Sequence, residues 1–230
     1  MTGPTIEVAG VGKAFVLLNQ GAARIPVMEG ARLEVFPGEC VALTGPSGAG
    51  KSTLMRMIYG NYLAAAGTIR VAGVDVAAAR PREILALRRD RLGYVSQFLR
   101  VVPRVPAREV VAEPCLRLGM AREAAIARAE GLLSRLNIPE RLWDLSPLTF
   151  SGGEQQRVNI ARGFAHEYAA LLLDEPTASL DAGNRAVVLE LIREAKGRGA
   201  AILGIFHDPE ARAAVCDREV DVGAFTPEAA

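Results

Sequence analysis

The stretch that decides the fold is the glycine-rich run GPSGAGKS at positions 45–52, which comprises Gly45, Pro46, Ser47, Gly48, Ala49, Gly50, Lys51 and Ser52. It fits the pattern G-x-x-x-x-G-K-[ST], in which backbone N–H groups surround a polyphosphate. An apolar run at 40–44 precedes it, and a helical pattern at 51–59 follows it. This context disfavours the alternative of a glycine-rich turn that matches by accident. The sequence therefore predicts a strand, a phosphate-binding loop and a helix whose N-terminus faces an anion.

Two side chains of this loop supply more specific chemistry. Lys51 can place a point charge on the β- and γ-phosphates of a nucleotide, and the Ser52 hydroxyl can bind Mg²⁺. Lys51 is also one of only three lysines among the 27 basic residues, with Lys13 and Lys196. Bias of a GC-rich genome is the plain explanation, but a position that keeps lysine in such a chain is one that needs a compact ammonium group.

Composition excludes several classes of protein. The chain has 230 residues, of which 50% are hydrophobic and 23% charged, as in a globular domain rather than a disordered chain. No apolar stretch approaches the ~20 residues of a spanning helix, and the N-terminus lacks the pattern of a signal peptide, so we expect a cytoplasmic protein without direct membrane insertion. The net charge of +1 gives no field to attract nucleic acid. The cysteines, Cys40, Cys115 and Cys216, are far apart in sequence, and we expect packed, reduced thiols rather than a metal site.

Strand and helix patterns alternate along most of the chain, which predicts an α/β fold with a mostly parallel sheet covered on both faces. Strands are expected at 5–11, 31–36, 40–44, 92–96, 169–173 and 200–205, a pair of strands at 67–76, and a loop at 19–23. Helices are expected at 51–59, 83–91, 107–118, 121–136, 139–145, 153–166, 183–197 and 208–215. We expect one domain, with a nucleotide-binding core of 1–97 and 151–222, an inserted helical subdomain at 98–150 and a tail at 223–230.

A second acidic motif follows the apolar strand at 169–173. Asp174 and Glu175 stand at its end, where carboxylates are costly unless a cation or polar chemistry waits there. In a parallel sheet, the carboxyl ends of strands open onto the ligand crevice. Asp174 is thus expected to hold Mg²⁺, and Glu175 to act as the general base for an attacking water. An exposed carboxylate pair that caps nothing is the plain alternative.

The run at 150–157, FSGGEQQR, resembles the signature motif of ABC-type ATPases. Its Ser151-x-x-Glu154 pattern is also a capping box, which predicts a helix start with a second anion site. The other motifs of that family follow in order: Gln97 resembles its Q-loop, Ser179 and Asp181 its D-loop, and His207 its switch histidine. The departures are mild, because Phe150 and Glu154 replace the commoner Leu and Gln.

The resemblance implies an ABC-type fold, with a RecA-like P-loop core, an N-terminal antiparallel β subdomain and an inserted helical subdomain. It implies hydrolysis of ATP with Mg²⁺ held by Ser52, Gln97 and Asp174, and a catalytic set of Glu175, His207 and Gln97. The ATP-binding set it implies is Phe15, which would stack on adenine unless it is strand core, together with residues 45–52 and Thr53. Signature residues Ser151, Gly152, Gly153 and Glu154 would contact the ATP of a second ATPase subunit.

Several stretches, at 59–63, 96–101, 140–143 and 155–164, are similar to the PhnL family, the ABC-type ATPase of the bacterial carbon–phosphorus lyase system for phosphonate breakdown. This implies lyase subunits as partners, and pairing with itself or with a sister ATPase of PhnK type. The segment 105–118 is also similar to ATPases of the lipoprotein-release and macrolide-export type, which drive membrane subunits. A nucleotide-dependent dimerisation module without catalysis is a third alternative. We expect 98–105 and the lobe that follows to dock onto a soluble protein of the lyase system, with apolar residues exposed beside Arg100 and Arg104, and Leu99→Asp with Val101→Asp to abolish that docking.

Overall fold

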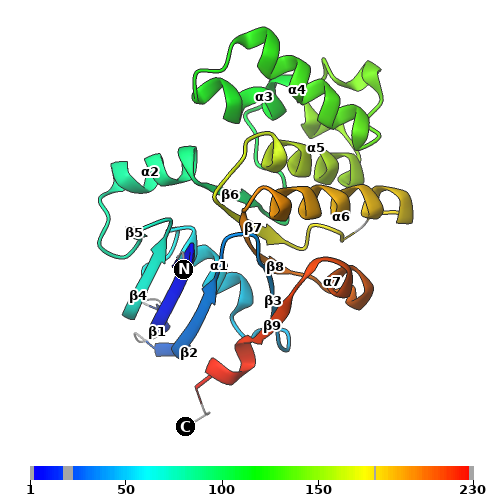
Figure 1. Cartoon of the computed structure of the whole chain (residues 1–230). Helices are drawn as coiled ribbons and strands as arrows, with labels where there is room; N and C mark the ends of the chain where they lie inside the picture. Colours follow the sequence, from blue (N-terminus) through cyan, green and yellow to red (C-terminus); the bar gives the residue numbers. More distant parts are fainter. Residues whose placement is uncertain (1–2, 18–22, 179, 228–230) are drawn as a thin grey trace.

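The computed structural model describes residues 3–17, 23–178 and 180–227. Two sheets form its framework (Figure 1): a four-stranded antiparallel sheet in the order β2-β1-β4-β5, and a five-stranded parallel sheet in the order β6-β7-β8-β3-β9. The strands are β1 (Ile6–Leu17), β2 (Ala23–Val35), β3 (Cys40–Thr44), β4 (Ala66–Val71), β5 (Val74–Asp75), β6 (Leu92–Val95), β7 (Ala170–Asp174), β8 (Ala201–Ile205) and β9 (Arg218–Asp221).

Helices cover the parallel sheet and build a separate lobe, which stands at the top of Figure 1. The α-helices are α1 (Lys51–Ile58), α2 (Pro81–Asp90), α3 (Ala107–Arg117), α4 (Arg122–Arg135), α5 (Gly152–Phe164), α6 (Ala182–Gly197) and α7 (Pro209–Val215). Three short 3-10 helices are η1 (Glu140–Leu142), η2 (Pro147–Thr149) and η3 (Val222–Phe225). The lobe consists of α3 and α4, which pack on each other and on α5.

The core divides into two apolar clusters on opposite faces of the parallel sheet. One joins the antiparallel sheet and α1 to the parallel sheet, with Ile6, Leu54 and Leu203 fully buried. The other joins the opposite face to α5, α6 and the helical lobe, with Ile202 and Leu133 fully buried. Strands β7 and β8 are buried along their whole length, because both faces of a central parallel strand are covered. This explains their unbroken apolar sequences.

Three features differ from the expectation. Strands β1 and β2 form a longer hairpin than predicted, because register shifts after Val8 and Val11 break the alternation in the part nearer the turn. The loop expected at 19–23 lies largely outside the described residues. The helix expected at 139–145 is the single 3-10 turn η1. Strand β9 and the turn η3 were not predicted, and η3 occupies the start of the expected tail.

Candidate active site

The glycine-rich loop runs from the end of β3 to the start of α1 in a conformation that only glycine adopts readily. Gly45, Gly48 and Gly50 have φ angles of 121°, 84° and 96°. A side chain at Gly45 would also lie 2.9 Å from the Asp221 carboxylate, which belongs to the end of β9. The loop is exposed from Gly45 to Gly48, while Ala49 is buried. The loop is therefore open to solvent, and the end of β9 lies close to Gly45.

Lys51 folds over this loop. Its ammonium group donates hydrogen bonds to the carbonyl oxygens of Gly45 and Pro46, at 2.7 and 2.8 Å. The other two lysines also donate to carbonyl oxygens, Lys13 to Leu63 and Lys196 to Val215. A compact ammonium with several donors suits all three positions, as expected from the scarcity of lysine. Lys51 thus stands beside the loop with its charge available to an incoming phosphate.

Asp174 and Glu175 lie at the carboxyl end of β7, and their environments differ. Asp174 is 5% exposed, and its carboxylate accepts a hydrogen bond of 3.0 Å from the Tyr94 hydroxyl. Burial raises the pKa of Asp174 above its ordinary value, and the hydrogen bond from Tyr94 opposes that shift. An oxygen ligand with a buried negative charge is well matched to a cation.

The Glu175 carboxylate contacts two side chains that follow neighbouring parts of the parallel sheet. Its Oε1 lies 2.8 Å from His207 Nε2, and its Oε2 accepts a hydrogen bond of 3.4 Å from Gln97 Nε2. Gln97 follows β6, Glu175 follows β7 and His207 follows β8. The φ of Glu175 is 54°, and its backbone N–H donates to the carbonyl of Ile205 on β8. The structure thus brings together the three residues predicted to be catalytic, around one carboxylate.

The expected magnesium ligands are a hydroxyl, an amide and a carboxylate, from Ser52, Gln97 and Asp174. These hard oxygen donors are the class that Mg²⁺ prefers, and Mg²⁺ usually keeps waters and substrate phosphates as its other ligands. Over the described ranges, no group of three or more His, Cys, Asp and Glu side chains forms a complete metal site. The residues present therefore fit an ion that is bound together with a nucleotide rather than by the protein alone.

The signature segment begins α5 with the predicted capping box. The Ser151 hydroxyl accepts from the Glu154 N–H at 3.3 Å, and the Glu154 carboxylate accepts from the Ser151 N–H at 2.9 Å. The Glu154 carboxylate also accepts from the Ser151 hydroxyl at 2.7 Å, and this bond, followed by the one from the Ser151 N–H, lowers the pKa of Glu154. Ser151 and Gly152 are exposed, and nothing lies within 4 Å of the place where a Gly152 side chain would stand. The helix N-terminus, with the half-buried Gly153 in its first turn, therefore faces open space.

Asp181 caps the next helix of the site. Its carboxylate accepts hydrogen bonds from the backbone N–H and the side-chain amide of Asn184, at 2.8 and 2.7 Å. The backbone bond lowers the pKa of Asp181. Asn137 of the helical lobe donates to the same Asn184 side chain at 3.1 Å, which ties α6 to the lobe. Ser179, the other predicted D-loop residue, lies outside the described residues.

Two hydrogen bonds join α5 to residues 96–100, the segment that contains Gln97, and the sequence did not predict them. Asn159, buried in α5, donates to the carbonyl of Ser96 at 2.5 Å, and Arg162 donates to the carbonyl of Arg100 at 3.3 Å. Asn159 stands in the apolar run Val158-Asn159-Ile160-Ala161. A buried amide in such a run requires a hydrogen-bond partner, and this was the available signal.

Phe15 lies on β1, half-buried, with its ring edge-on to Tyr62 at a centroid distance of 5.5 Å. The Lys13 ammonium lies 5.0 Å from the Phe15 centroid. Lys13 pairs with Met28 of β2, and a side chain at Gly50 would lie 3.1 Å from Met28 Cε. This part of the hairpin therefore borders the phosphate loop, and adenine stacking by Phe15 stays a prediction.

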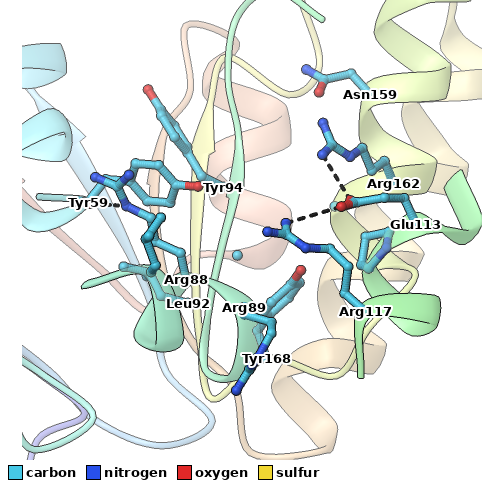
Figure 2. Close-up of a pocket in the computed structure, with 14 residues that line it drawn as sticks. Tyr59, Arg88, Arg89, Leu92, Tyr94, Glu113, Arg117, Asn159, Arg162 and Tyr168 are labelled. Carbon is cyan, nitrogen blue, oxygen red and sulfur yellow. Dashed lines mark hydrogen bonds and ion pairs between the residues drawn. The ribbon is translucent and has the colours of Figure 1, made fainter. Parts of the chain in front are cut away.

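A cavity of about 240 Å³ lies on the other side of Tyr94, between β6 and the helical lobe (Figure 2). Arginines from α2, α3 and α5 line it, and Glu113 forms ion pairs with Arg117 and Arg162 at 3.1 and 3.0 Å. Its lining includes neither Gln97 nor any residue of the phosphate loop, so this cavity is separate from the phosphate site.

Comparison with known proteins adds the family. Residues 28–178 match the family described as ABC transporter. The lipoprotein-releasing system ATP-binding protein LolD of Novosphingobium aromaticivorans is 41% identical over 212 residues, which cover 90% of this chain and 92% of that protein. The macrolide export ATP-binding/permease protein MacB of Marinobacter nauticus is 39% identical over 98% of this chain, but only 36% of that protein is covered. The chain thus spans about a third of this MacB relative.

Solved structures agree with the sequence comparison. A dimeric post-hydrolysis state of the ATP-binding cassette MJ0796, bound to ADP and Pi, superposes with a TM-score of 0.85 at 27% identity, over 95% of both chains. The ABC-type fold implied by the resemblance is confirmed, with its antiparallel N-terminal sheet and its parallel sheet covered by helices. In the described part of the chain, no helix is both long and apolar enough to cross a bilayer. The chain belongs to the ABC transporter family and is an ABC-type ATPase that uses ATP and Mg²⁺.

Proposed function

We propose that this chain is the ATPase subunit of a membrane transporter of the lipoprotein-release or macrolide-export class. The observation that carries the proposal is the match to LolD over nearly the full length of both chains, at 41% identity. MacB-type relatives match over the same cassette. LolD and MacB are named for lipoprotein release and macrolide export rather than for phosphonate breakdown, so the expected role in the carbon–phosphorus lyase system gives way to the transporter alternative.

The residues of the site have a consistent set of roles in ATP hydrolysis. The phosphate loop binds the polyphosphate through its backbone N–H groups, with Lys51 neutralising the terminal phosphates. Glu175 accepts the proton of the attacking water, while Gln97 and His207 orient the Glu175 carboxylate and the terminal phosphate. Bound Mg²⁺ supplies charge neutralisation on the phosphates. The contacts of Glu175 with both neighbours support this assignment, and they argue against a module that only binds nucleotide.

The active unit in this proposal is a pair of ATPase subunits, this chain with itself or with a sister ATPase. Each nucleotide is shared between the phosphate loop of one subunit and the start of α5 in the other. The exposed start of α5 supports this, because Ser151 and Gly152 are exposed and open space surrounds Gly152, so the N–H groups that the Glu154 capping box does not use can face an anion of another subunit. The MJ0796 neighbours are described as dimers.

The proposed docking surface for the permease is the segment after Gln97, within which Leu99 and Val101 were the positions first chosen for substitution. Leu99 and Val101 pack partly against the core of the helical lobe, whereas Phe98 and Val102 are 72% and 70% exposed. Val102 also borders a groove of about 420 Å³ whose lining is mostly apolar and which reaches Val110 of α3. Exposed apolar side chains beside arginines are typical of interface cores, so Phe98 and Val102 form the centre of the proposed docking surface.

Affinity capture from detergent extracts tests this function. A tagged chain, expressed in its native host, is expected to capture a membrane permease that mass spectrometry identifies. The double variant Phe98→Asp/Val102→Asp is expected to lose the permease and to keep ATP binding, because a carboxylate cannot enter an apolar interface without a partner.

The matched control is Phe36→Asp, which changes an exposed phenylalanine in the turn before β3, at the opposite end of that strand from the phosphate loop. This variant is expected to retain the permease. Capture of carbon–phosphorus lyase subunits without any permease, together with loss of growth on a phosphonate when the gene is deleted, would overturn the transporter proposal in favour of the lyase role.

A further inference from the structure

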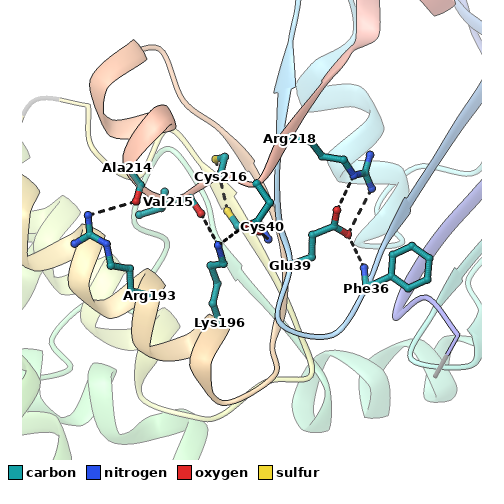
Figure 3. Close-up of polar contacts among 10 residues, drawn as sticks. Phe36, Glu39, Cys40, Arg193, Lys196, Ala214, Val215, Cys216 and Arg218 are labelled. Carbon is teal, nitrogen blue, oxygen red and sulfur yellow. Dashed lines mark hydrogen bonds and ion pairs between the residues drawn. The ribbon is translucent and has the colours of Figure 1, made fainter. Parts of the chain in front are cut away.

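Cys40 and Cys216, which are 176 positions apart in the sequence, lie side by side at the amino end of two neighbouring strands of the parallel sheet (Figure 3). Cys40 begins β3 and Cys216 precedes β9, and their sulfur atoms lie 3.6 Å apart. The two strands are hydrogen-bonded neighbours, and the Asp217 N–H donates to the Cys40 carbonyl at 2.8 Å. A disulfide requires a sulfur separation of about 2.05 Å, so bond formation needs the two sulfur atoms to approach each other from 3.6 Å.

The two thiols differ in exposure and in chemistry. Cys40 is fully buried, whereas Cys216 is half-buried and open to small solutes. The contact with the Cys40 thiol lowers the pKa of Cys216, partial burial opposes that shift, and the nearby Lys196 ammonium lowers the pKa further. The same contact, together with burial, raises the pKa of Cys40. An accessible sulfur with thiolate character beside a protected thiol is the arrangement of an attacking and a resolving cysteine.

Lys196 is held in place to act on this pair. Its ammonium donates to the carbonyl of Val215 at 2.9 Å and to the Asp217 carboxylate at 2.8 Å. Val215 and Asp217 flank Cys216 in the chain. Their bonds therefore hold the Lys196 ammonium near the Cys216 thiol (Figure 3). Asp217 and Glu219 are the negative groups that oppose it.

We propose that Cys40 and Cys216 form a reversible disulfide under oxidising conditions, which fastens the C-terminal strand β9 to β3. With a peroxide as oxidant, the Cys216 thiolate attacks one oxygen, which yields a sulfenic acid and releases hydroxide. The Cys40 sulfur then attacks the Cys216 sulfur, the S–S bond forms, and the hydroxyl leaves as water with the Cys40 proton. A dithiol reductant reverses the step by thiol–disulfide exchange and is itself oxidised to a disulfide.

Such a bond would reinforce a weak edge of the sheet. Strand β9 has only four residues, three of them exposed, and it pairs with β3 alone. Its last residue, Asp221, lies so close to the phosphate loop that a side chain at Gly45 would be 2.9 Å from its carboxylate. Because the disulfide closes a loop that spans most of the chain, it removes much conformational freedom from the unfolded state. The inference is independent of which membrane partner the ATPase has.

Oxidation of the purified full-length chain with hydrogen peroxide tests the proposal. After free thiols are alkylated in denaturant, peptide mass spectrometry is expected to find Cys40 joined to Cys216, with Cys115 alkylated. The melting temperature is expected to rise by about 5–15 °C, from the usual effect of a long-range disulfide in a chain of this size. Dithiothreitol should restore both the original melting temperature and three alkylatable thiols.

Three variants complete the experiment. Cys216→Ser and Cys40→Ala are expected to lose both the cross-link and the rise in melting temperature, and the serine variant removes the thiol at a half-buried position where folding is least disturbed. Cys115→Ser is the matched control, since Cys115 is a buried thiol that donates to the Ala165 carbonyl, and it should retain both effects. Three alkylatable thiols after oxidation, or a sulfinic acid on Cys216 with Cys40 free, would overturn the proposal.

Discussion

Replacing Glu175 by glutamine isolates the proton-accepting role of the proposed base. The two side chains have nearly the same shape, and Glu175 is held in place by its 2.8 Å contact with His207 and its backbone bond to Ile205. The variant therefore keeps the geometry and loses the charge and the basic oxygen. Loss of a general base slows the reaction by about 10² to 10⁴-fold. This corresponds to a barrier increase of about 2.7–5.4 kcal/mol, at about 1.36 kcal/mol per factor of ten.

Two measurements are needed, phosphate release from Mg-ATP and the dissociation constant of ATP. We expect the first to fall by at least about 10²-fold and the second to stay nearly unchanged, because no contact of the phosphate loop is altered. Glu210→Gln, at an exposed glutamate in the first turn of α7, is the matched control and should hydrolyse ATP normally. Normal turnover by Glu175→Gln, in a preparation free of contaminating ATPases, would refute the assignment of the base.

Three further predictions concern the dimer, the core and the acid limb of the activity. Ser151→Arg should abolish ATP-dependent association of the Glu175→Gln variant in solution scattering, because the new side chain fills the exposed helix start; an unchanged dimer would contradict the shared site. Gly163→Ala should destabilise the fold by about 1–3 kcal/mol in thermal denaturation, since its methyl would lie 2.2 Å from a side-chain carbon of β6, whereas Gly131→Ala, with open space around it, should not. Tyr94→Phe removes a hydrogen bond that lowers the pKa of Asp174, so the pKa of Asp174 should rise in the variant. Protons should then compete with Mg²⁺ for the Asp174 carboxylate up to a higher pH. The acid limb of the pH profile of ATP hydrolysis, measured at low Mg²⁺, should shift to higher pH, and an unshifted profile would contradict this.

The sequence was most informative where local pattern and chemistry coincide. The phosphate loop was predictable because its glycines, lysine and flanking strand and helix all lie within 20 residues. The capping box at Ser151 likewise depends on four consecutive positions, and the structure confirms it. The grouping of Gln97, Glu175 and His207 as a catalytic set was implied by the ABC-type resemblance, and in the structure each follows the carboxyl end of a parallel strand.

Features that depend on distant pairing could not be predicted in this way. Strand β9 reads Arg218-Glu219-Val220-Asp221, a short polar run without clear alternation, and only its neighbour β3 makes it a strand. The proximity of Cys40 and Cys216 depends on the same pairing. The exposure of Phe98 and Val102, rather than of the adjacent apolar residues, depends on how the helical lobe covers this segment.

The hydrogen bond from Asn159 to the carbonyl of Ser96 has a mechanical consequence. It fixes the residue before Gln97 to the helix that begins at Ser151. In the proposed pair of subunits, Gln97 serves the ATP bound to its own chain and Ser151 the ATP bound to the other. A displacement of Phe98 by a bound partner is therefore expected to affect both nucleotide-binding sites of the pair. In the proposed pair, a partner bound to one subunit would in this way couple the two hydrolysis sites.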